Sequence, residues 1–223
     1  MTDKRTERVK MICSLAMLTA LAMAADFFLR LPNISGFLTY EPKDVILTIG
    51  AFIYGPIAGI VMSLIVCLVE MVTVSTTGPI GLLMNFLAAG VFVGIASVIY
   101  YRKKTLPRAI IGLVAGSFSM VAIMLLWNYI ITPIYQGIPR EAVLDLFPTV
   151  LIPFNAIKAG LNSALVLFLY KGVVTALRKS RLVPERESAD GNNKVMNTVI
   201  LLSISALIVA TMILVLLIFS KII

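Results

Sequence analysis

The feature that most constrains the fold of this chain is a series of long apolar segments. They lie at about residues 11–29, 45–74, 79–100, 108–131, 148–170 and 197–219. A helix needs about 20 apolar residues to cross a bilayer core of about 30 Å. Because 60% of the 223 residues are hydrophobic, the sequence predicts an all-α polytopic membrane protein. We expect the first segment to be a retained span rather than a cleaved signal.

The segment 45–74 is long enough for one helix or two, and the positive charges decide between them. Basic residues form three clusters: Lys4, Arg5, Arg8 and Lys10; Arg102, Lys103, Lys104 and Arg108; and Lys171, Arg178, Lys179, Arg181, Arg186 and Lys194. The positive-inside rule places all three in the cytoplasm, with a cytoplasmic N-terminus, only if 45–74 crosses twice. We therefore predict helices over about 43–54 and 56–74, joined by a turn at Gly55-Pro56.

The predicted helix over 43–54 is too short to cross a membrane alone. Its 12 residues reach only about 18 Å, against a bilayer core of about 30 Å. The helix must therefore begin below the membrane surface, and the segment 30–42 must enter the protein to meet it. Residues 31–36, Leu-Pro-Asn-Ile-Ser-Gly, are typical of a loop. We expect this loop to line a cavity or to be buried in protein.

The basic clusters also explain the net charge of +8, because they hold 14 of the 19 lysine and arginine residues. Clusters beside membrane spans attract anionic lipid, whereas a nucleic-acid site needs a continuous basic surface. We therefore predict membrane lipid as a partner and no nucleic acid.

Lys158 is the most unusual residue of the apolar segments. Asn155 lies three residues before it and Asn162 four residues after it, so a helix places all three on one face. A charge and two amides are unfavourable against lipid, and we predict that this face lines a binding site. A structural lysine paired with a buried acid, or one that extends to the membrane surface, is the alternative. Asn162 by itself is also consistent with a bond to a neighbouring helix.

Three further positions are candidates for the same site. Asn128 lies between Trp127 and Tyr129; it either faces a planar polar ligand or belongs to an aromatic belt at the membrane surface. Residues 38–40 offer backbone groups to a ligand, although the same segment also leads into a helix. Asn85 is more consistent with a contact between helices.

Motifs for catalysis and nucleotide binding are absent from the sequence. There is no GxxxxGK[ST] loop for ATP phosphates, no HExxH, no GxSxG and no histidine. Asp26, Asp44 and Glu70 are too widely spaced in the sequence to suggest a metal site. Cys13 and Cys67 lie in separate apolar segments, without a spacing for metal binding. We therefore predict neither an enzyme nor a metal or cofactor site.

Several short motifs, in this order, are similar to those of a known family. Tyr40-Glu41-Pro42-Lys43-Asp44, followed by Gly55-Pro56 and Gly59, resembles the second-helix region of the substrate-binding (S) components of energy-coupling factor (ECF) vitamin transporters. The later motifs resemble the riboflavin-specific members: Trp127-Asn128-Tyr129, Thr132-Pro133, Pro139-Arg140-Glu141-Ala142 and Leu151-Ile152-Pro153-Phe154-Asn155-Ala156-Ile157-Lys158. The resemblance covers about residues 8–180.

The resemblance implies a six-helix core that binds riboflavin, as a transported substrate, near the outer side of a bacterial cell membrane. By position, the residues expected to contact riboflavin are Leu38, Thr39, Tyr40, Asn128, Asn155 and Lys158. The three polar side chains on helices, Asn128, Asn155 and Lys158, would bond the flavin ring. Two further residues, Glu41 and Asn85, are candidates for the ribityl chain.

The resemblance also implies separate energising subunits. Ala16, Ala20 and Ala24 recur every four residues, and small residues at this spacing allow another helix to approach closely. That helix belongs either to this chain or, as in the family, to a transmembrane coupling protein. Two ABC ATPases would supply the energy, and the family's proposed mechanism turns the whole S component over in the membrane.

The C-terminal region departs from the family pattern. Residues 1–180 form the predicted core, 181–196 a polar cytoplasmic linker, and 197–220 an additional transmembrane helix. That helix either restricts movement, adds a partner surface or is passive. Other interpretations stay open: an S component for another vitamin or ring compound, a membrane assembly protein, or an enzyme that modifies lipids.

Overall fold

The structure is a computed structural model that describes residues 2–30, 38–75 and 77–180, with residues 206, 208–210 and 213. The elements within residues 2–180 are all helical: α1 (Thr2–Leu29), α2 (Lys43–Tyr54), α3 (Pro56–Thr73), α4 (Gly78–Tyr101), α5 (Leu106–Gln136), α6 (Arg140–Leu146), the π-helical segment η1 (Phe147–Leu151) and α7 (Ile152–Lys179). In this described part, five helical segments are long and apolar enough to cross a membrane. The prediction of an all-α polytopic membrane protein is confirmed.

The segment 43–74 folds as the two helices that the charge pattern predicts. α2 ends at Tyr54 and α3 begins at Pro56. Gly55 between them has a φ of 104°, a conformation that glycine adopts without the steric penalty of a side chain. Pro56 occupies the first turn of α3, where its missing N–H removes no helical hydrogen bond. The predicted turn is therefore confirmed at the predicted residues.

The short helix α2 lies among α1, α3, α4 and α7 and packs against each of them. Every residue from Lys43 to Phe52 is buried, so the helix begins inside the protein, as its 12-residue length predicts. Leu38, Tyr40 and Glu41 before it are buried as well. The described end of the loop therefore enters the interior, and residues 31–37 of the predicted loop lie outside the described residues.

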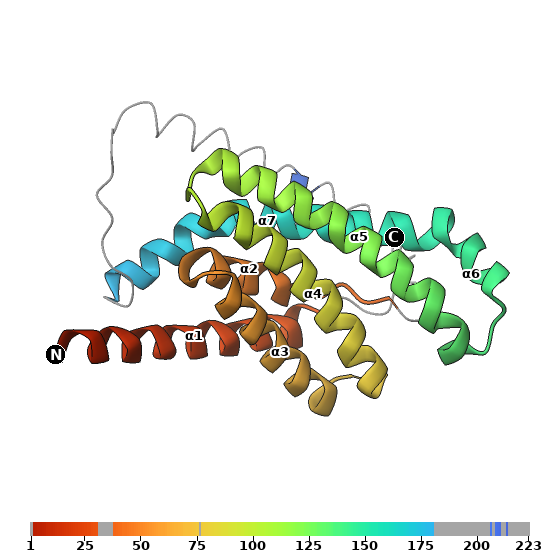
Figure 1. The fold of residues 1–223 in the computed structure, drawn as a ribbon, viewed down its shortest axis with the longest axis horizontal. Helices are drawn as coiled ribbons and strands as arrows, with labels where there is room; N and C mark the ends of the chain where they lie inside the picture. Colours follow the sequence, from red (N-terminus) through yellow and green to blue (C-terminus); the bar gives the residue numbers. More distant parts are fainter. Residues whose placement is uncertain are drawn as a thin grey trace.

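The basic clusters of the described chain gather at one end of the bundle. Figure 1 shows the N-terminal end of α1, the α4–α5 connection and the C-terminal end of α7 at this end, together with the α2–α3 turn. We call it the basic end. The opposite end, where α5 leads into α6, is called the pocket end. The arrangement agrees with the parity that the positive-inside rule requires.

Helices α4 and α5 pack closely because α5 presents glycines to α4. A Cβ on Gly112 would lie 2.6 Å from the carbonyl oxygen of Ala96, and one on Gly116 would lie 2.8 Å from that of Phe92. Both distances are shorter than non-bonded atoms allow. The spacing of small residues in α5 therefore sets the distance between the two helices.

The last predicted helix of the core, 148–170, is less regular than expected. The observed helix α7 begins at Ile152, after the short helix α6 and the π-helical segment η1. Pro148 and Pro153 lack the N–H groups that a regular helix uses, and the hydrogen-bonding pattern changes between them. The helix predicted over 108–131 is also longer, because α5 continues to Gln136 past Pro133.

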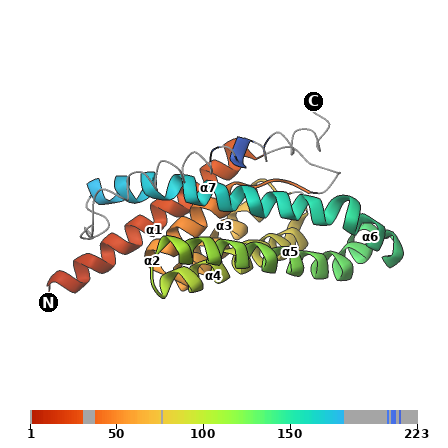
Figure 2. The same cartoon turned by 90° about the horizontal axis from the view of Figure 1, so that it is seen from above.

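Figure 2 shows α7 running beside α5 along the length of the molecule. This pair forms one side of the pocket end. The predicted linker 181–196 lies outside the described residues. So does most of the predicted helix 197–220, although residues 206, 208–210 and 213 within it are helical. Both assignments stay predictions.

Candidate functional site

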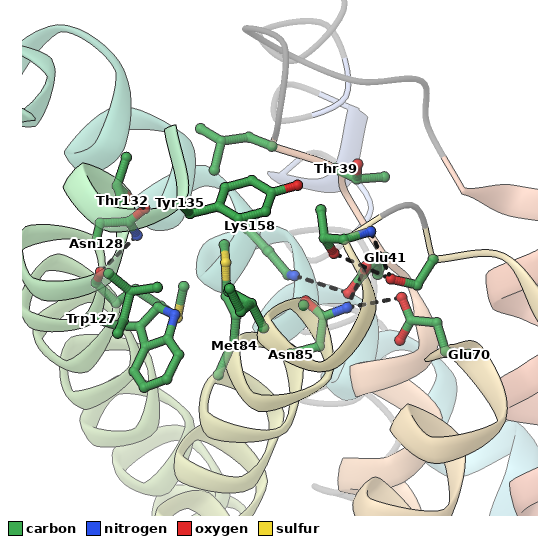
Figure 3. A pocket seen from close by; sticks show the side chains of 18 of the residues that line it. Thr39, Glu41, Glu70, Met84, Asn85, Trp127, Asn128, Thr132, Tyr135 and Lys158 are labelled. Atoms are coloured by element: carbon green, nitrogen blue, oxygen red, sulfur yellow. Dashed lines mark hydrogen bonds and ion pairs between the residues drawn. The ribbon is translucent and has the colours of Figure 1, made fainter. Parts of the chain in front are cut away.

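A cavity of about 660 Å³ lies among the helices at the pocket end. Pockets for small ligands commonly measure about 300–1,000 Å³. Its walls come from the end of α1, residues 38–41, and the helices α3, α4, α5 and α7. Figure 3 shows side chains of these elements turned toward one another around it.

Most of the residues predicted to contact a ligand line this cavity. They are Leu38, Thr39, Glu41, Asn85, Asn128, Asn155 and Lys158. Tyr40 is not among the lining residues; it is buried, and its hydroxyl donates to Asn162 Oδ1 at 3.0 Å. Asn162 also lies off the cavity wall, and its Nδ2 donates to Asp44 Oδ2 at 3.3 Å. Contact of the lining residues with a ligand stays a prediction.

The predicted polar face of α7 is buried throughout. Asn155, Lys158 and Asn162 are each no more than 6% exposed. Asn155 Nδ2 donates to the carbonyl oxygen of Leu151 at 2.8 Å, a bond that holds its amide in place beside the cavity. Lys158 lines the cavity and also lies 3.5 Å from a carboxylate oxygen of Glu41. The buried acid of the alternative interpretation is therefore present, and contact of Lys158 with a ligand stays a prediction.

Asn128 of α5 faces inward and is 1% exposed. Its Nδ2 donates to the carbonyl oxygen of Met124 at 2.8 Å, and its Oδ1 accepts from the Thr132 hydroxyl at 2.9 Å. Trp127 also lines the cavity, and its indole N–H has no hydrogen-bond partner among the described residues. Tyr129 points elsewhere, with its ring centre 5.7 Å from Arg140 Cζ. The two aromatic neighbours of Asn128 thus have different environments.

Seven charged side chains meet beside the cavity and are called the charged cluster. They are Asp26, Arg30, Glu41, Lys43, Asp44, Glu70 and Lys158. Glu41 is at its centre: its carboxylate oxygens lie 2.6 Å from Arg30 Nη2 and 2.9 Å from Lys43 Nζ. Asp26 Oδ2 lies 3.7 Å from Arg30 Nη2. The cluster joins the end of α1, the start of α2 and the helices α3 and α7.

Glu70 of α3 is the second centre of the charged cluster. It pairs with both Arg30 and Lys43. Asn85 of α4 links the two centres, since its Nδ2 donates to Glu70 Oε1 at 2.8 Å and to Glu41 Oε1 at 3.1 Å. The contact between helices that the sequence predicts for Asn85 is therefore present, and it lies on the cavity wall.

The surroundings of Glu41 explain how a carboxylate remains charged while buried. Burial by itself raises the pKa of Glu41, because it removes water from the charged form. The nearby Lys43, Lys158 and Arg30 charges outweigh burial and hold the pKa well below its usual range. The ionised carboxylate is thus kept in place by three cations from three parts of the chain.

The sequence separation of Asp26, Asp44 and Glu70 concealed that they meet in one cluster. Arg30 and Glu70 also line the cavity, although the sequence reasoning did not propose them for the site. A signal was available: Glu70 is the only charged residue of α3, and Asp26 is the only one between Lys10 and Arg30. A lone charge within a membrane span indicates a functional site or a buried partner.

The cavity has two walls of different chemistry. The charged wall consists of Arg30, Glu41, Glu70 and Asn85. Met124, Trp127, Tyr135 and Phe154 supply apolar and aromatic lining, with the amides of Asn128 and Asn155, and we call this group the aromatic wall. In Figure 3, Trp127 and Asn128 lie on one side and Glu41 and Glu70 on the other, with Lys158 and Met84 between. A ligand that fills the cavity would therefore meet an aromatic surface at one end and paired charges at the other.

The predicted stripe of small residues on α1 lies on its exposed side. Ala16, Ala20 and Ala24 are exposed, whereas Leu18 and Ala22 face the bundle. No helix of the described residues covers the stripe. Of the two alternatives for these alanines, packing within the described part of this chain does not occur.

Comparison with known proteins gives consistent matches over the helical core. The profile of the family described as "ECF transporter, substrate-specific component" matches residues 10–170. The riboflavin transporter RibU of Staphylococcus aureus is 29% identical over 177 residues, which cover 76% of this chain and 93% of that protein. The riboflavin transporter FmnP of Bacillus subtilis is 25% identical over 163 residues, or 68% of this chain and 85% of that protein.

A solved structure described as "Structure and mechanism of the S component of a bacterial ECF transporter" has the same fold. It superimposes with a TM-score of 0.65 at 28% sequence identity, over 77% of this chain and 99% of that one. The family match ends at residue 170. The predicted linker and the predicted additional helix both lie beyond this point.

Proposed function

Because this chain belongs to the family of substrate-specific (S) components of ECF transporters, we propose that it is the riboflavin-binding subunit of an importer of this class. Two relatives that align with most of their length to this chain are riboflavin transporters. The observation in this chain that carries the proposal is the cavity in which Asn128, Asn155 and Lys158 lie beside an aromatic wall.

The chemistry of the cavity suits a flavin ring. The isoalloxazine ring is planar, with apolar faces and one edge of carbonyl, N–H and ring-nitrogen groups. Trp127, Tyr135 and Phe154 offer flat surfaces to the faces of the ring. Amides both donate and accept hydrogen bonds, and a lysine donates to carbonyl oxygens. Asn128, Asn155 and Lys158 thus match the polar edge.

Energy for transport would come from other subunits. The family is one of transporter components, and the sequence contains no phosphate-binding loop for ATP. We propose a transmembrane coupling protein and two ABC ATPases as partners. The exposed alanine stripe on α1 supports this proposal, because small side chains let a helix of the coupling protein approach closely.

We place the basic end of the bundle in the cytoplasm of a bacterium and the pocket end toward the outside of its cell membrane. The positive-inside rule supports this orientation. The N-terminus is then cytoplasmic, and riboflavin enters the cavity from outside. Exposed apolar residues such as Ile57, Phe118 and Ile134 would contact lipid.

The direct test is titration of the purified protein with riboflavin in detergent, followed by flavin fluorescence and absorbance. We expect quenching that saturates at about one riboflavin per chain. The variant Lys158→Ala should need more riboflavin for the same quenching, because it lacks a charged donor to the ring. Absence of quenching in the unaltered protein would reject riboflavin as the ligand and favour another vitamin.

The proposed docking of a coupling protein on the alanine stripe has a separate test, which does not depend on riboflavin affinity. Ala16→Leu adds bulk to the exposed stripe, so it should abolish riboflavin uptake in cells that supply the energising subunits, while binding in detergent is unchanged. Ala156→Leu is the matched control, since Ala156 is exposed on α7, and its uptake should be normal. Full uptake by Ala16→Leu would contradict a docking role for the stripe.

A further inference from the structure

The C-terminal segment, residues 197–220, contacts the helical core at Val209. The structure describes five residues of this segment, all of them helical: Ala206, Ile208, Val209, Ala210 and Ile213. Val209 is partly buried and packs against a cluster of buried apolar side chains, whereas the other four are exposed. Figure 2 shows the described part of the segment, in blue, on the side of α7 that faces away from α4. The contact lies beyond residue 170, where the family match ends.

The cluster that Val209 contacts is continuous with the wall of the cavity. Its six buried members are each no more than 4% exposed, and we call them the backing cluster: Leu38, Tyr40, Val143, Leu151, Phe154 and Leu161. Leu38 and Phe154 also line the cavity, whereas Val209 does not. Val209 therefore packs against the same group of side chains that a ligand in the cavity would touch, without touching the ligand itself.

Leu38 belongs to a part of the wall that is not helical. Residues 38–41 precede α2 and have no helical hydrogen-bonding pattern. Such a segment is displaced more easily than a helix, because its position depends on side-chain packing rather than on a ladder of backbone bonds. The side chain of Leu38 is 1% exposed within the backing cluster. A further apolar contact on this cluster thus makes displacement of residues 38–41 less favourable.

The C-terminal segment has the length and the composition to make this contact within one chain. Val209 follows the end of α7 at Lys179 by 30 residues, and an extended chain of this length spans on the order of 100 Å. From Lys179 back to Leu161, α7 measures only about 27 Å. Residues 197–220 contain no charged side chain, so they can remain among apolar groups. A tethered segment also has a higher local concentration than a second molecule.

We propose that the C-terminal segment docks, through Val209, on the backing cluster of its own chain and that this docking slows the exchange of ligand with the cavity. The occupant of this apolar surface is thus a segment of the same chain rather than lipid or a second copy. Val209 is a positioning residue, because it acts through the backing cluster. The docking is independent of the ligand, whereas the effect on exchange rests on the proposed function.

Photo-crosslinking in membranes tests the docking without any ligand. The full chain carries the photoreactive amino acid benzoylphenylalanine in place of Val209, and mass spectrometry identifies the peptides that are joined after irradiation. We expect cross-links within one chain, to peptides that contain residues of the backing cluster. The same replacement at the exposed neighbour Ile208 is the matched control and should give few of these cross-links. Cross-links between two chains, or to lipid alone, would overturn the docking.

The rates of riboflavin binding and release test the effect on exchange. Stopped-flow fluorescence measures association, and recovery of fluorescence after dilution of the loaded protein measures dissociation. In Val209→Ala, both rate constants should rise about threefold, because two methyl groups of a partly buried side chain are removed. The dissociation constant should therefore be nearly unchanged. Ile208→Ala shortens an exposed side chain of the same segment and should leave both rates unaltered.

The two rates together distinguish control of exchange from a purely structural role. If Val209→Ala speeds dissociation alone, so that affinity falls, Val209 only shapes the wall, and the effect on exchange is overturned. Unchanged rates in Val209→Ala would overturn it as well. If the unaltered protein binds no riboflavin, the proposed function fails, and the cross-links still decide whether the segment docks on the backing cluster.

Discussion

Lys43 at the start of α2 and Phe52 near its end are both buried, yet they meet opposite chemistry. At its start, Lys43 pairs with Glu41 and Glu70 in the charged cluster. At its end, Phe52 stacks on Tyr100, with 4.2 Å between ring centroids, and meets the edge of Tyr170 at 6.1 Å. One helix of 12 residues thus connects a buried ionic network to a partly buried aromatic cluster.

The two ends of α2 differ in what their contacts contribute: the aromatic end contributes to stability, and the ionic end fits a role in ligand recognition. Buried ion pairs are often no more stabilising than apolar residues of similar size, whereas aromatic packing contributes to stability directly. A purely structural helix start would not need seven charges. Because the charged cluster borders the cavity and the aromatic cluster does not, the charges fit a role in ligand binding.

The largest expected effect is a loss of stability when the ion pairs at the start of α2 are removed. Lys43→Met removes the cation that pairs with Glu41 and Glu70 and leaves both carboxylates less compensated. The free energy of unfolding should fall by about 3–5 kcal/mol. Denaturant or thermal unfolding in detergent measures it.

The double variant Lys43→Met with Glu70→Gln should recover part of this loss, because one unpaired carboxylate is then neutral. Lys4→Met, at an exposed lysine of α1, is the control and should not change stability. If Lys43→Met is as stable as the unaltered protein, the ionic end is not a coupled network.

The second-largest effect should appear in riboflavin affinity. It distinguishes Asn155 from Asn162, which lie on the same face of α7. Asn155→Ala removes an amide that lines the cavity, so riboflavin binding should weaken by about 1–2 kcal/mol. Asn162→Ala removes an amide that bonds Tyr40 and Asp44 instead. It should lower stability and leave affinity unchanged. Equal affinities for both variants would contradict the assignment of the cavity as the ligand site.

The sequence predicted the helical framework because its signals are local. The Gly55-Pro56 turn needs only two adjacent residues, and the length of each span follows from uninterrupted apolar runs. The buried start of α2 also followed, because 12 residues are too few to cross a membrane. Lys158 stood out for the same reason, as a single charge within an apolar run.

The charged wall could not be assembled from the sequence because its members are held together by the fold. Arg30 and Glu70 are 40 residues apart and have no shared periodicity, so nothing local pairs them. Tyr40 was expected to contact the ligand through its backbone or by packing, which stays a prediction, but the bond of its hydroxyl to Asn162 could not be foreseen. The direction of a side chain beside a loop depends on what packs around it.

A third prediction addresses the aromatic end. Phe52→Leu keeps most of the buried volume but removes the stacking on Tyr100. The free energy of unfolding should fall by about 1–1.5 kcal/mol, measured as for Lys43→Met. Riboflavin affinity should be unchanged, because Phe52 does not line the cavity. A clear loss of affinity would show that packing at the basic end controls the shape of the pocket end.

The smallest effect should come from a single hydroxyl at the aromatic end. The Tyr100 and Tyr170 hydroxyl oxygens lie 2.8 Å apart, and Tyr170→Phe removes this hydrogen bond while it keeps the ring. Stability should fall by about 0.5–1 kcal/mol without a change in riboflavin affinity. Tyr101→Phe is the matched control: Tyr101 is 41% exposed, so water replaces any bond it makes. If Tyr170→Phe alters affinity as much as stability, the two ends of α2 are energetically coupled, and binding at the pocket end draws on contacts at the basic end.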